Sequence, residues 1–102
     1  MRLEHPAYHV YIVTGLSHFR VLYIGVTSNL PARIDAHRQG KSNGFTHRYR
    51  LCKLVYVEAF TYVRDAIARE KQLKGWKRER KIALIDSSNP HWIELDARPV
   101  QW

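Results

Sequence analysis

The chain has 102 residues, the length of one ordinary domain, which leaves no room for a second core of useful size. Hydrophobic residues make up 45% and charged residues 25%, which excludes a disordered tail and predicts a folded globular domain. Seventeen Lys and Arg residues against nine Asp and Glu residues give a formal net charge of +8, so nucleic acid is the natural partner. Charge alone leaves open a soluble protein that is merely basic.

The single cysteine excludes an intramolecular disulfide and a cysteine-based zinc site, which fits a reducing compartment. Cys52 lies just before an apolar run at residues 54–57, and we expect a buried thiol without chemistry. The first residues lack the apolar segment of a signal peptide, and no stretch approaches the roughly 18 apolar residues of a membrane span. We therefore expect a cytoplasmic protein with no membrane partner.

Three segments have the composition of β-strands. Residues 8–13 and 19–26 are rich in aromatic and β-branched side chains, and the turn-like residues 14–18 between them predict a β-hairpin. Residues 54–60 read as a third strand. A chain this short is expected to add that strand to the hairpin, which gives a small three-stranded antiparallel sheet in an α+β domain.

The first helix is predicted directly after the hairpin. Ser28 or Asn29 can cap its start, Pro31 is tolerated in its first turn, and the helical pattern continues to Gly40. Residues 41–49 contain turn signals with basic and aromatic side chains, so we expect a loop that can meet a ligand.

Two amphipathic helices are predicted in the second half of the chain. Thr61 can cap the first, which ends at Gly75, and the second runs through residues 76–85. The turn-forming residues 87–90 stop it. The whole chain is expected to be one domain, 1–102, with its core at about residues 6–90 and a tail at 91–102.

Four side chains at the junction of hairpin and first helix are candidates for a site. Tyr11 and Tyr23 lie on paired strands, and Arg33 and His37 are one turn apart on one face of the helix that follows. Arginine binds phosphate oxygens bidentately, and a neighbouring imidazole can donate to an oxyanion or leaving group. Simple cross-strand packing of the tyrosines and a solvated helix face for Arg33 are the alternatives.

Glu70 is a lone acid in an otherwise basic segment, residues 69–74. Ile67 and Leu73, three residues to either side, indicate that it leans toward the core-facing stripe of its helix. It can be paired with Arg or Lys, or it can hold Mg²⁺ together with substrate phosphate, a mode that needs only one carboxylate.

Several segments follow one another in a distinctive order. They are Val10-Tyr11, Tyr23-Ile24-Gly25, Asn29-Leu30-x-x-Arg33-x-x-x-His37 and Ala68-Arg69-Glu70-Lys71-Gln72-Leu73-Lys74. Gly44-Phe45-Thr46, Leu54-Val55-Tyr56 and Asn89-Pro90-x-Trp92 extend the set over nearly the whole chain. This ordered set resembles the GIY-YIG nuclease family, and most of all its small single-domain members.

The resemblance implies a three-stranded antiparallel sheet packed by helices and a phosphodiester hydrolase that uses one Mg²⁺ or Mn²⁺. By position it implies that Tyr23 is the base that activates water and that Tyr11 lies beside it. It implies that Arg33 steadies the phosphate, that His37 stands on the next helical turn, and that Glu70 binds the metal.

The chain departs from the family pattern at two positions. His9 stands where the first glycine of the family's name motif would be, and Val26 stands where some members have lysine. The loop could supply the missing cation, with His47 preferred because it can also exchange protons. The candidate nucleic-acid-binding residues are Lys41, His47, Arg48, Lys74 and Asn89, the last because it matches a late asparagine of the family.

The preferred function is therefore a metal-dependent endonuclease acting on DNA. A nucleic-acid-binding module that has kept the fold without catalysis is the alternative, and a protein-interaction domain anchored by Trp76, Trp92 and Trp102 is a third hypothesis that leaves the charge unexplained. Residues 77–81 are either a solvated helix face or a strip that follows a nucleic-acid backbone. The natural substrate, DNA or RNA, and a monomeric or homodimeric state stay open.

Overall fold

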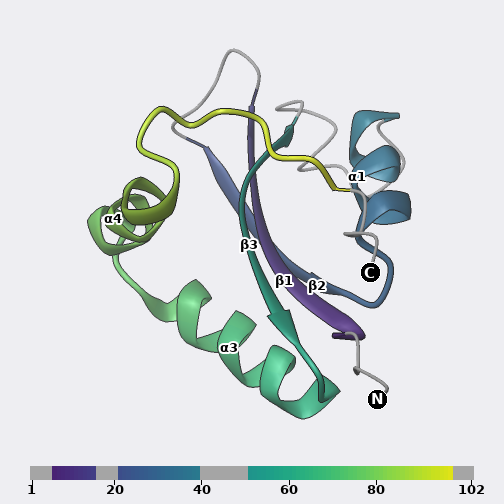
Figure 1. Cartoon of the computed structure of the whole chain (residues 1–102). Coiled ribbons are helices and arrows are strands. Elements are labelled where there is room, and N and C mark those ends of the chain that lie inside the picture. Colours follow the sequence, from purple (N-terminus) through teal and green to yellow (C-terminus); the bar gives the residue numbers. More distant parts are fainter. Residues whose placement is uncertain (1–5, 16–20, 40–50, 98–102) are drawn as a thin grey trace, which may run out of the picture.

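The computed structural model describes residues 6–15, 21–39 and 51–97. Its centre is a three-stranded antiparallel sheet of β1 (Tyr8–Gly15), β2 (Leu22–Thr27) and β3 (Leu51–Phe60) (Figure 1). The spatial order is β2-β1-β3, so β1 is the central strand and β2 is an edge. The predicted α+β fold with a small antiparallel sheet is confirmed.

Helices cover both faces of this sheet. Helix α1 (Leu30–Arg38) lies on one side, and α3 (Val63–Gly75) and α4 (Arg78–Ser88) lie on the other (Figure 1). Successive side chains of a strand point to opposite faces, so β1 sends Val10 and Ile12 into the core under α3 and α4. Tyr11 and Val13 point into a second core under α1. In the described residues no helix is long and apolar enough to cross a membrane.

The start of α1 follows the sequence prediction. Asn29 is the N-cap, and its Oδ1 accepts a hydrogen bond from the backbone N–H of Ala32 at 3.2 Å. Pro31 sits in the first turn, where a missing N–H costs nothing. These local signals place the helix immediately after the edge strand, so that its inner face meets the Tyr11 side of the sheet.

The strand boundaries differ from those expected. Thr14 and Gly15 belong to β1 rather than to a turn, because they pair with Lys53 and Leu51 of β3. Strand β3 accordingly begins at Leu51, three residues earlier than predicted, and includes Cys52, which is half-buried rather than buried. Strand β2 runs one residue beyond the predicted end, and helix α1 stops before Gly40. Residues 16–20 and 40–50, with most of both predicted loops, lie outside the described residues.

The end of α3 at Gly75 is as predicted, but the starts of the last two helices differ from those expected. Tyr62, not Thr61, is the N-cap of α3, and its side chain makes no capping hydrogen bond. Gly75 is the last residue of α3, and Trp76 is the residue that ends this helix rather than a member of the next. The reason is tertiary: the Trp76 ring packs against the core under α3 and α4 while Arg80 stacks over it at 3.9 Å.

The segment after α4 is held to the sheet by one buried side chain. Asn89 is 6% exposed, and its Nδ2 donates to the carbonyls of Val55 at 3.1 Å and Ile93 at 2.8 Å. Its Oδ1 accepts from the N–H of Ile93 at 3.0 Å. The N–H of Leu95 then donates to Leu54 of β3. These bonds occupy both amide hydrogens of Asn89, so the prediction that it contacts nucleic acid receives no support from its position.

We expect Asn89→Ala to lower the free energy of unfolding by about 2–3 kcal/mol, because it leaves backbone groups on β3 and on the following segment without partners. Urea unfolding measures this loss. Ser88→Ala is the neighbouring control, since its hydroxyl is 3.5 Å from the carbonyl of Ile85, and we expect a change below about 0.5 kcal/mol. Equal losses in the two variants would contradict the anchoring role.

Candidate active site

The hydroxyl of Tyr11 is the point where the candidate residues meet. Nε of Arg33 donates to Tyr11 Oη at 3.0 Å, and Oη lies 3.0 Å from Nε2 of His37. Tyr11 comes from the central strand, and the other two come from successive turns of α1. The predicted shared face of Arg33 and His37 is therefore present, and it is turned toward the sheet. Tyr11 is 0% and His37 2% exposed.

Gly25 makes this arrangement possible. It is paired with Tyr11 across β1 and β2, and the Tyr11 ring lies over it. A Cβ at position 25 would stand 2.5 Å from Tyr11 Oη and 2.6 Å from Cζ, far inside van der Waals contact. In the sequence, Gly25 was only part of the Tyr23-Ile24-Gly25 motif. The structure shows that a glycine is required there because the Tyr11 side chain approaches the backbone too closely for a Cβ.

The proton positions around Tyr11 follow from burial and from the guanidinium. Burial raises the pKa of Tyr11 against the opposing effect of the Arg33 hydrogen bond, so the phenol stays protonated at neutral pH. Burial, followed by the positive charge of Arg33, lowers the pKa of His37 to about 4. The imidazole is therefore neutral. Because Arg33 donates to Oη, we infer that the phenolic proton is directed to Nε2 of His37.

Tyr23 completes the group from the edge strand. Its ring centroid is 6.4 Å from that of Tyr11 and 5.3 Å from that of His37, in tilted and edge-on orientations. The largest cause that raises the pKa of Arg33 is its hydrogen bond to Tyr11, and Tyr23 acts in the same direction. Unlike Tyr11, Tyr23 is only half-buried. The two tyrosines thus share one guanidinium but differ in their access to solvent.

Glu70 approaches from the other side of the sheet. It lies on α3, on the buried face that Ala66 and Leu73 define, and its side chain is 16% exposed. Ile67 is 38% exposed and does not belong to this face, so the predicted inward lean is present with different neighbours. Nζ of Lys74 lies 3.2 Å from the carboxylate. The charge of Glu70 is one of the smaller causes that raise the pKa of Tyr11.

A single carboxylate limits the metal that this site can hold. In the part of the chain that the structure describes, no three His, Cys, Asp or Glu side chains are grouped as a metal cage. Mg²⁺ keeps several waters and is commonly bound by one or two carboxylates plus substrate phosphates. Glu70 fits that mode and does not fit a closed structural site.

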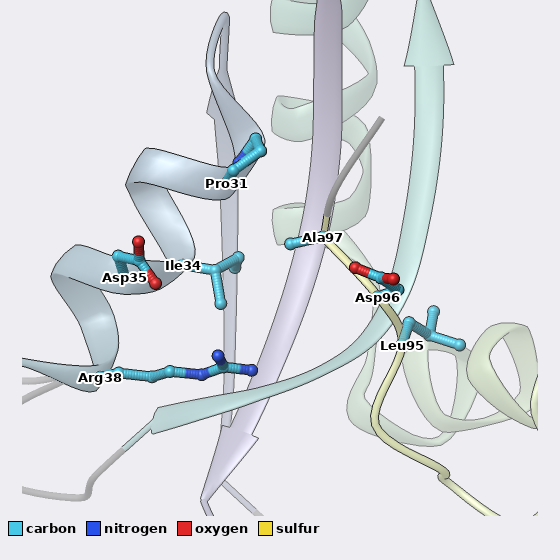
Figure 2. A pocket seen from close by; sticks show the side chains of 7 residues that line it. All are labelled: Pro31, Ile34, Asp35, Arg38, Leu95, Asp96 and Ala97. Atoms are coloured by element: carbon cyan, nitrogen blue, oxygen red, sulfur yellow. The ribbon is translucent and has the colours of Figure 1, made fainter. Parts of the chain in front are cut away.

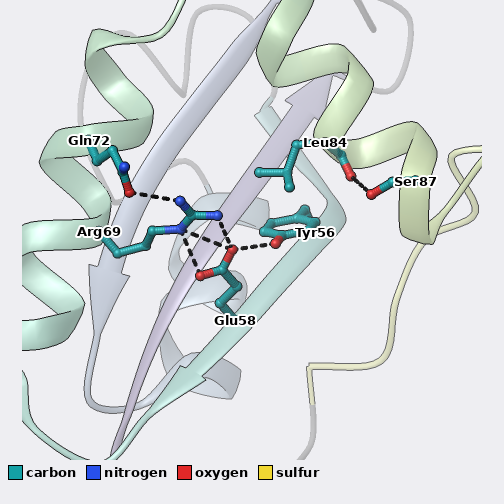
Figure 3. Close-up of polar contacts among 6 residues, drawn as sticks. All are labelled: Tyr56, Glu58, Arg69, Gln72, Leu84 and Ser87. Carbon is teal, nitrogen blue, oxygen red and sulfur yellow. Dashed lines mark hydrogen bonds and ion pairs between the residues drawn. The ribbon is translucent and has the colours of Figure 1, made fainter.

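A second polar cluster was not foreseen from the sequence. Figure 3 shows the Glu58 carboxylate between Arg69 and Tyr56. Arg69 donates to Glu58 through Nε at 2.9 Å and Nη2 at 2.8 Å and to Gln72 through Nη1 at 2.8 Å. Burial, with the neighbouring carboxylate, raises the pKa of Tyr56 to about 12. The cluster ties α3 to β3 through the residue directly before Glu70, and the alternation of Tyr56 and Glu58 along β3 was its only sequence signal.

Of the remaining predicted residues, only Lys74 and Asn89 fall within the described ranges. Lys41, His47 and Arg48 lie outside the described residues, and Lys74 contacts Glu70. A pocket of about 270 Å³ lies between α1 and residues 95–97, lined by Ile34, Arg38 and Leu95 among others (Figure 2). Of the predicted site residues that the structure describes, none lines this pocket, so Tyr11, Arg33 and His37 meet elsewhere.

Comparison with known proteins agrees with this geometry. Residues 7–83 match the model of the GIY-YIG catalytic domain. A UPF0213 protein of Staphylococcus haemolyticus is 37% identical over 79 residues, which cover 78% of this chain and 94% of the relative. A UPF0213 protein of Clostridium perfringens is 41% identical over 68 residues, which cover 67% of this chain and 73% of the relative. Neither relative's name states an activity. No solved structure matches the chain at a comparable level of significance.

We expect Gly25→Ala to displace the Tyr11 ring and lower the free energy of unfolding by about 1–3 kcal/mol, the usual effect of overpacking. Gly75→Ala is the matched control. No atom lies within 4 Å of its Cβ and the residue is helical, so we expect no loss and a gain of up to about 1 kcal/mol. Chemical denaturation measures both. A neutral Gly25→Ala would mean that Tyr11 does not need this space.

The lowered pKa of His37 predicts a loss of stability in acid. As pH falls, the unfolded chain binds a proton at His37 near the ordinary pKa of about 6.5, whereas the folded protein leaves it neutral until about pH 4. The free energy of unfolding therefore falls across this window, by on the order of 3 kcal/mol at its lower end. Denaturant titrations at several pH values measure the slope.

His37→Gln keeps an acceptor for Tyr11 but cannot titrate, so its stability should fall less between pH 7 and 4 than that of the unmodified protein. His91→Gln, at an exposed position, should leave the slope unchanged. The assignment fails if all three proteins lose stability in parallel.

Proposed function

This chain belongs to the GIY-YIG family, and on that premise we propose that it is a metal-dependent endonuclease that hydrolyses phosphodiester bonds in DNA. The observation that carries the proposal is the Tyr11 hydroxyl held between Nε of Arg33 and Nε2 of His37, with Tyr23 beside them. Attack of water on phosphorus requires a base, a cation for the non-bridging oxygens and a means to offset charge on the leaving group. Each requirement has a candidate group.

Arg33 is the group that binds the phosphate. Its Nε is engaged by Tyr11, so the guanidinium is fixed in orientation and its terminal Nη end is the part directed to a ligand. Two parallel N–H donors match two phosphate oxygens, and a pre-oriented fork loses little side-chain entropy when it binds. A lysine in this place would keep the charge but lose both the bond to Tyr11 and the bidentate contact.

Tyr23 is the better candidate for the base. Tyr11 is fully buried, both partners of its hydroxyl are protein groups, and its raised pKa keeps the proton in place, so it cannot easily take one from water. Tyr23 is half-buried and can meet solvent. A tyrosinate at position 23 could accept the proton of the attacking water, and the adjacent guanidinium would offset its negative charge.

Tyr11 and His37 act as positioning residues in this scheme. His37 is too deeply buried to reach a leaving group, and as a neutral acceptor it holds the phenol that in turn holds Arg33. The earlier possibility that His37 donates to the leaving group is therefore not part of the proposal. Together, Tyr11 and His37 fix the orientation of the Arg33 guanidinium, the proposed phosphate-binding cation.

Glu70 would hold the divalent metal. A bound Mg²⁺ or Mn²⁺ would supply positive charge to the phosphate oxygens that carry charge in the transition state. Glu70 offers one carboxylate with partial exposure, and Lys74 beside it offsets its charge until a metal does so. Most of the metal's shell would be water and substrate oxygen.

The Glu70–Lys74 pair also keeps a second function open. If this pair is only a structural ion pair, the fold binds nucleic acid without cleaving it, through phosphate contacts alone. Cleavage assays separate the two functions.

We expect the protein to cut a panel of single-stranded, duplex or branched DNA with Mg²⁺ or Mn²⁺, and Tyr23→Phe and Glu70→Gln to slow cleavage by at least on the order of 100-fold with binding retained. Tyr62→Phe and Glu94→Gln remove the same groups at exposed positions, so their rates should stay unchanged. If the unmodified protein binds DNA without cleaving it, the nuclease function is rejected in favour of a nucleic-acid-binding module. Equal rates in all variants would refute the assigned residues.

A further inference from the structure

The positive charge of the chain is concentrated where α3 meets α4. Residues 69–81 contain seven Lys or Arg and two Glu, a net charge of +5 out of +8 for the whole chain. This stretch forms the second half of α3, the short connection and the first turn of α4. A local excess of this size in 13 residues creates a positive potential over one part of the surface, which favours an anionic partner.

The structure separates the cations that are already neutralised from those that are not. Arg69 is bonded to Glu58 inside the cluster of Figure 3, and Lys74 is paired with Glu70. The remaining exposed cations are Lys71, Lys77, Arg78 and Arg80, which we call the basic junction. In the described part of the chain no ion pair to an acid is found for any of these four.

One cation of the basic junction is held in place. The guanidinium of Arg80 lies 3.9 Å from the centroid of the Trp76 ring, and Arg69 approaches the same ring at 5.2 Å. The indole packs against the core under α3 and α4, so the stacked arginine is anchored to the body of the domain. A pre-oriented arginine binds an anion at a lower cost in side-chain entropy than a mobile one.

The basic junction continues from the candidate active site. Lys74 contacts Glu70 and lies two residues before Trp76, so the cations follow one another along the chain from the proposed metal ligand onward. A nucleic-acid strand whose reacting phosphate lies at Glu70 can therefore place its neighbouring phosphates against these side chains.

We propose that the basic junction binds the phosphodiester backbone of nucleic acid on one side of the reacting phosphate. The proposal deepens the proposed function, because it selects as substrate a strand several nucleotides long rather than a free nucleotide or a small phosphodiester. Contacts of this kind carry charge and position but no sequence information, so they stabilise binding to all sequences alike.

The test is the salt dependence of binding to a fluorescent DNA duplex, measured by anisotropy between about 50 and 200 mM KCl in EDTA. Lys77→Gln/Arg78→Gln removes two cations of the basic junction. Lys53→Gln/Arg64→Gln removes the same charge from β3 and the start of α3, outside the basic junction, at two residues that form no ion pair in the described part of the chain. Each lost phosphate contact lowers the slope of log K against log salt by about 0.9.

We expect the first variant to lose about two units of slope and to bind on the order of tenfold more weakly, irrespective of DNA sequence. The control should retain the slope of the unmodified protein. Equal losses in both variants would show that only net charge matters, and no loss in the first would show that the junction does not touch DNA; either result overturns the proposal. The binding assay needs neither metal nor cleavage. Its result can therefore be interpreted even if the protein proves not to be a nuclease.

Discussion

The hydrogen-bonded position of the Tyr11 hydroxyl is the constraint on which the candidate site depends. One oxygen joins the central strand to two turns of α1 through Arg33 and His37, and it can do so only because Gly25 of the edge strand has no side chain. Burial keeps the imidazole neutral and the phenol protonated. The result is a fixed guanidinium at the surface of an otherwise apolar core, a rigid element of the kind that precise phosphate binding needs.

The second half of the site is fixed independently, from the opposite face of the sheet. Arg69 is bonded to Glu58 on β3, so the turn of α3 that carries Glu70 is tied to the sheet by a charged pair as well as by apolar packing. The same turn leads into the connection where Arg80 stacks on Trp76. The proposed metal ligand Glu70 and the basic junction are thus held by the same fixed segment, α3 and its connection to α4. Glu70 is proposed to bind a metal, whereas the basic junction is proposed to bind phosphates.

Local signals in the sequence foretold much of the architecture. Aromatic and β-branched residues indicated the three strands. Asn29 with Pro31 marked the start of α1, because a capping side chain and a proline act within one turn. The end of β1 and the start of β3 were missed because Thr14, Gly15 and Leu51 are strand residues only through the pairing of β1 with β3. The start of α4 was misplaced at Trp76, whose ring packs against the core under α3 and α4, a contact that the local sequence does not indicate.

The sequence by itself determined the fold class, the excess of positive charge and the helical spacing that places Arg33 and His37 on one face, because these depend on composition and on fixed local periodicities. Tertiary structure alone decided that this face meets Tyr11 and that Gly25 must lack a side chain. It also decided that Asn89 bonds to β3 and that Tyr23 is less buried than Tyr11. Burial and contact depend on residues far apart in the chain, and no local pattern records them.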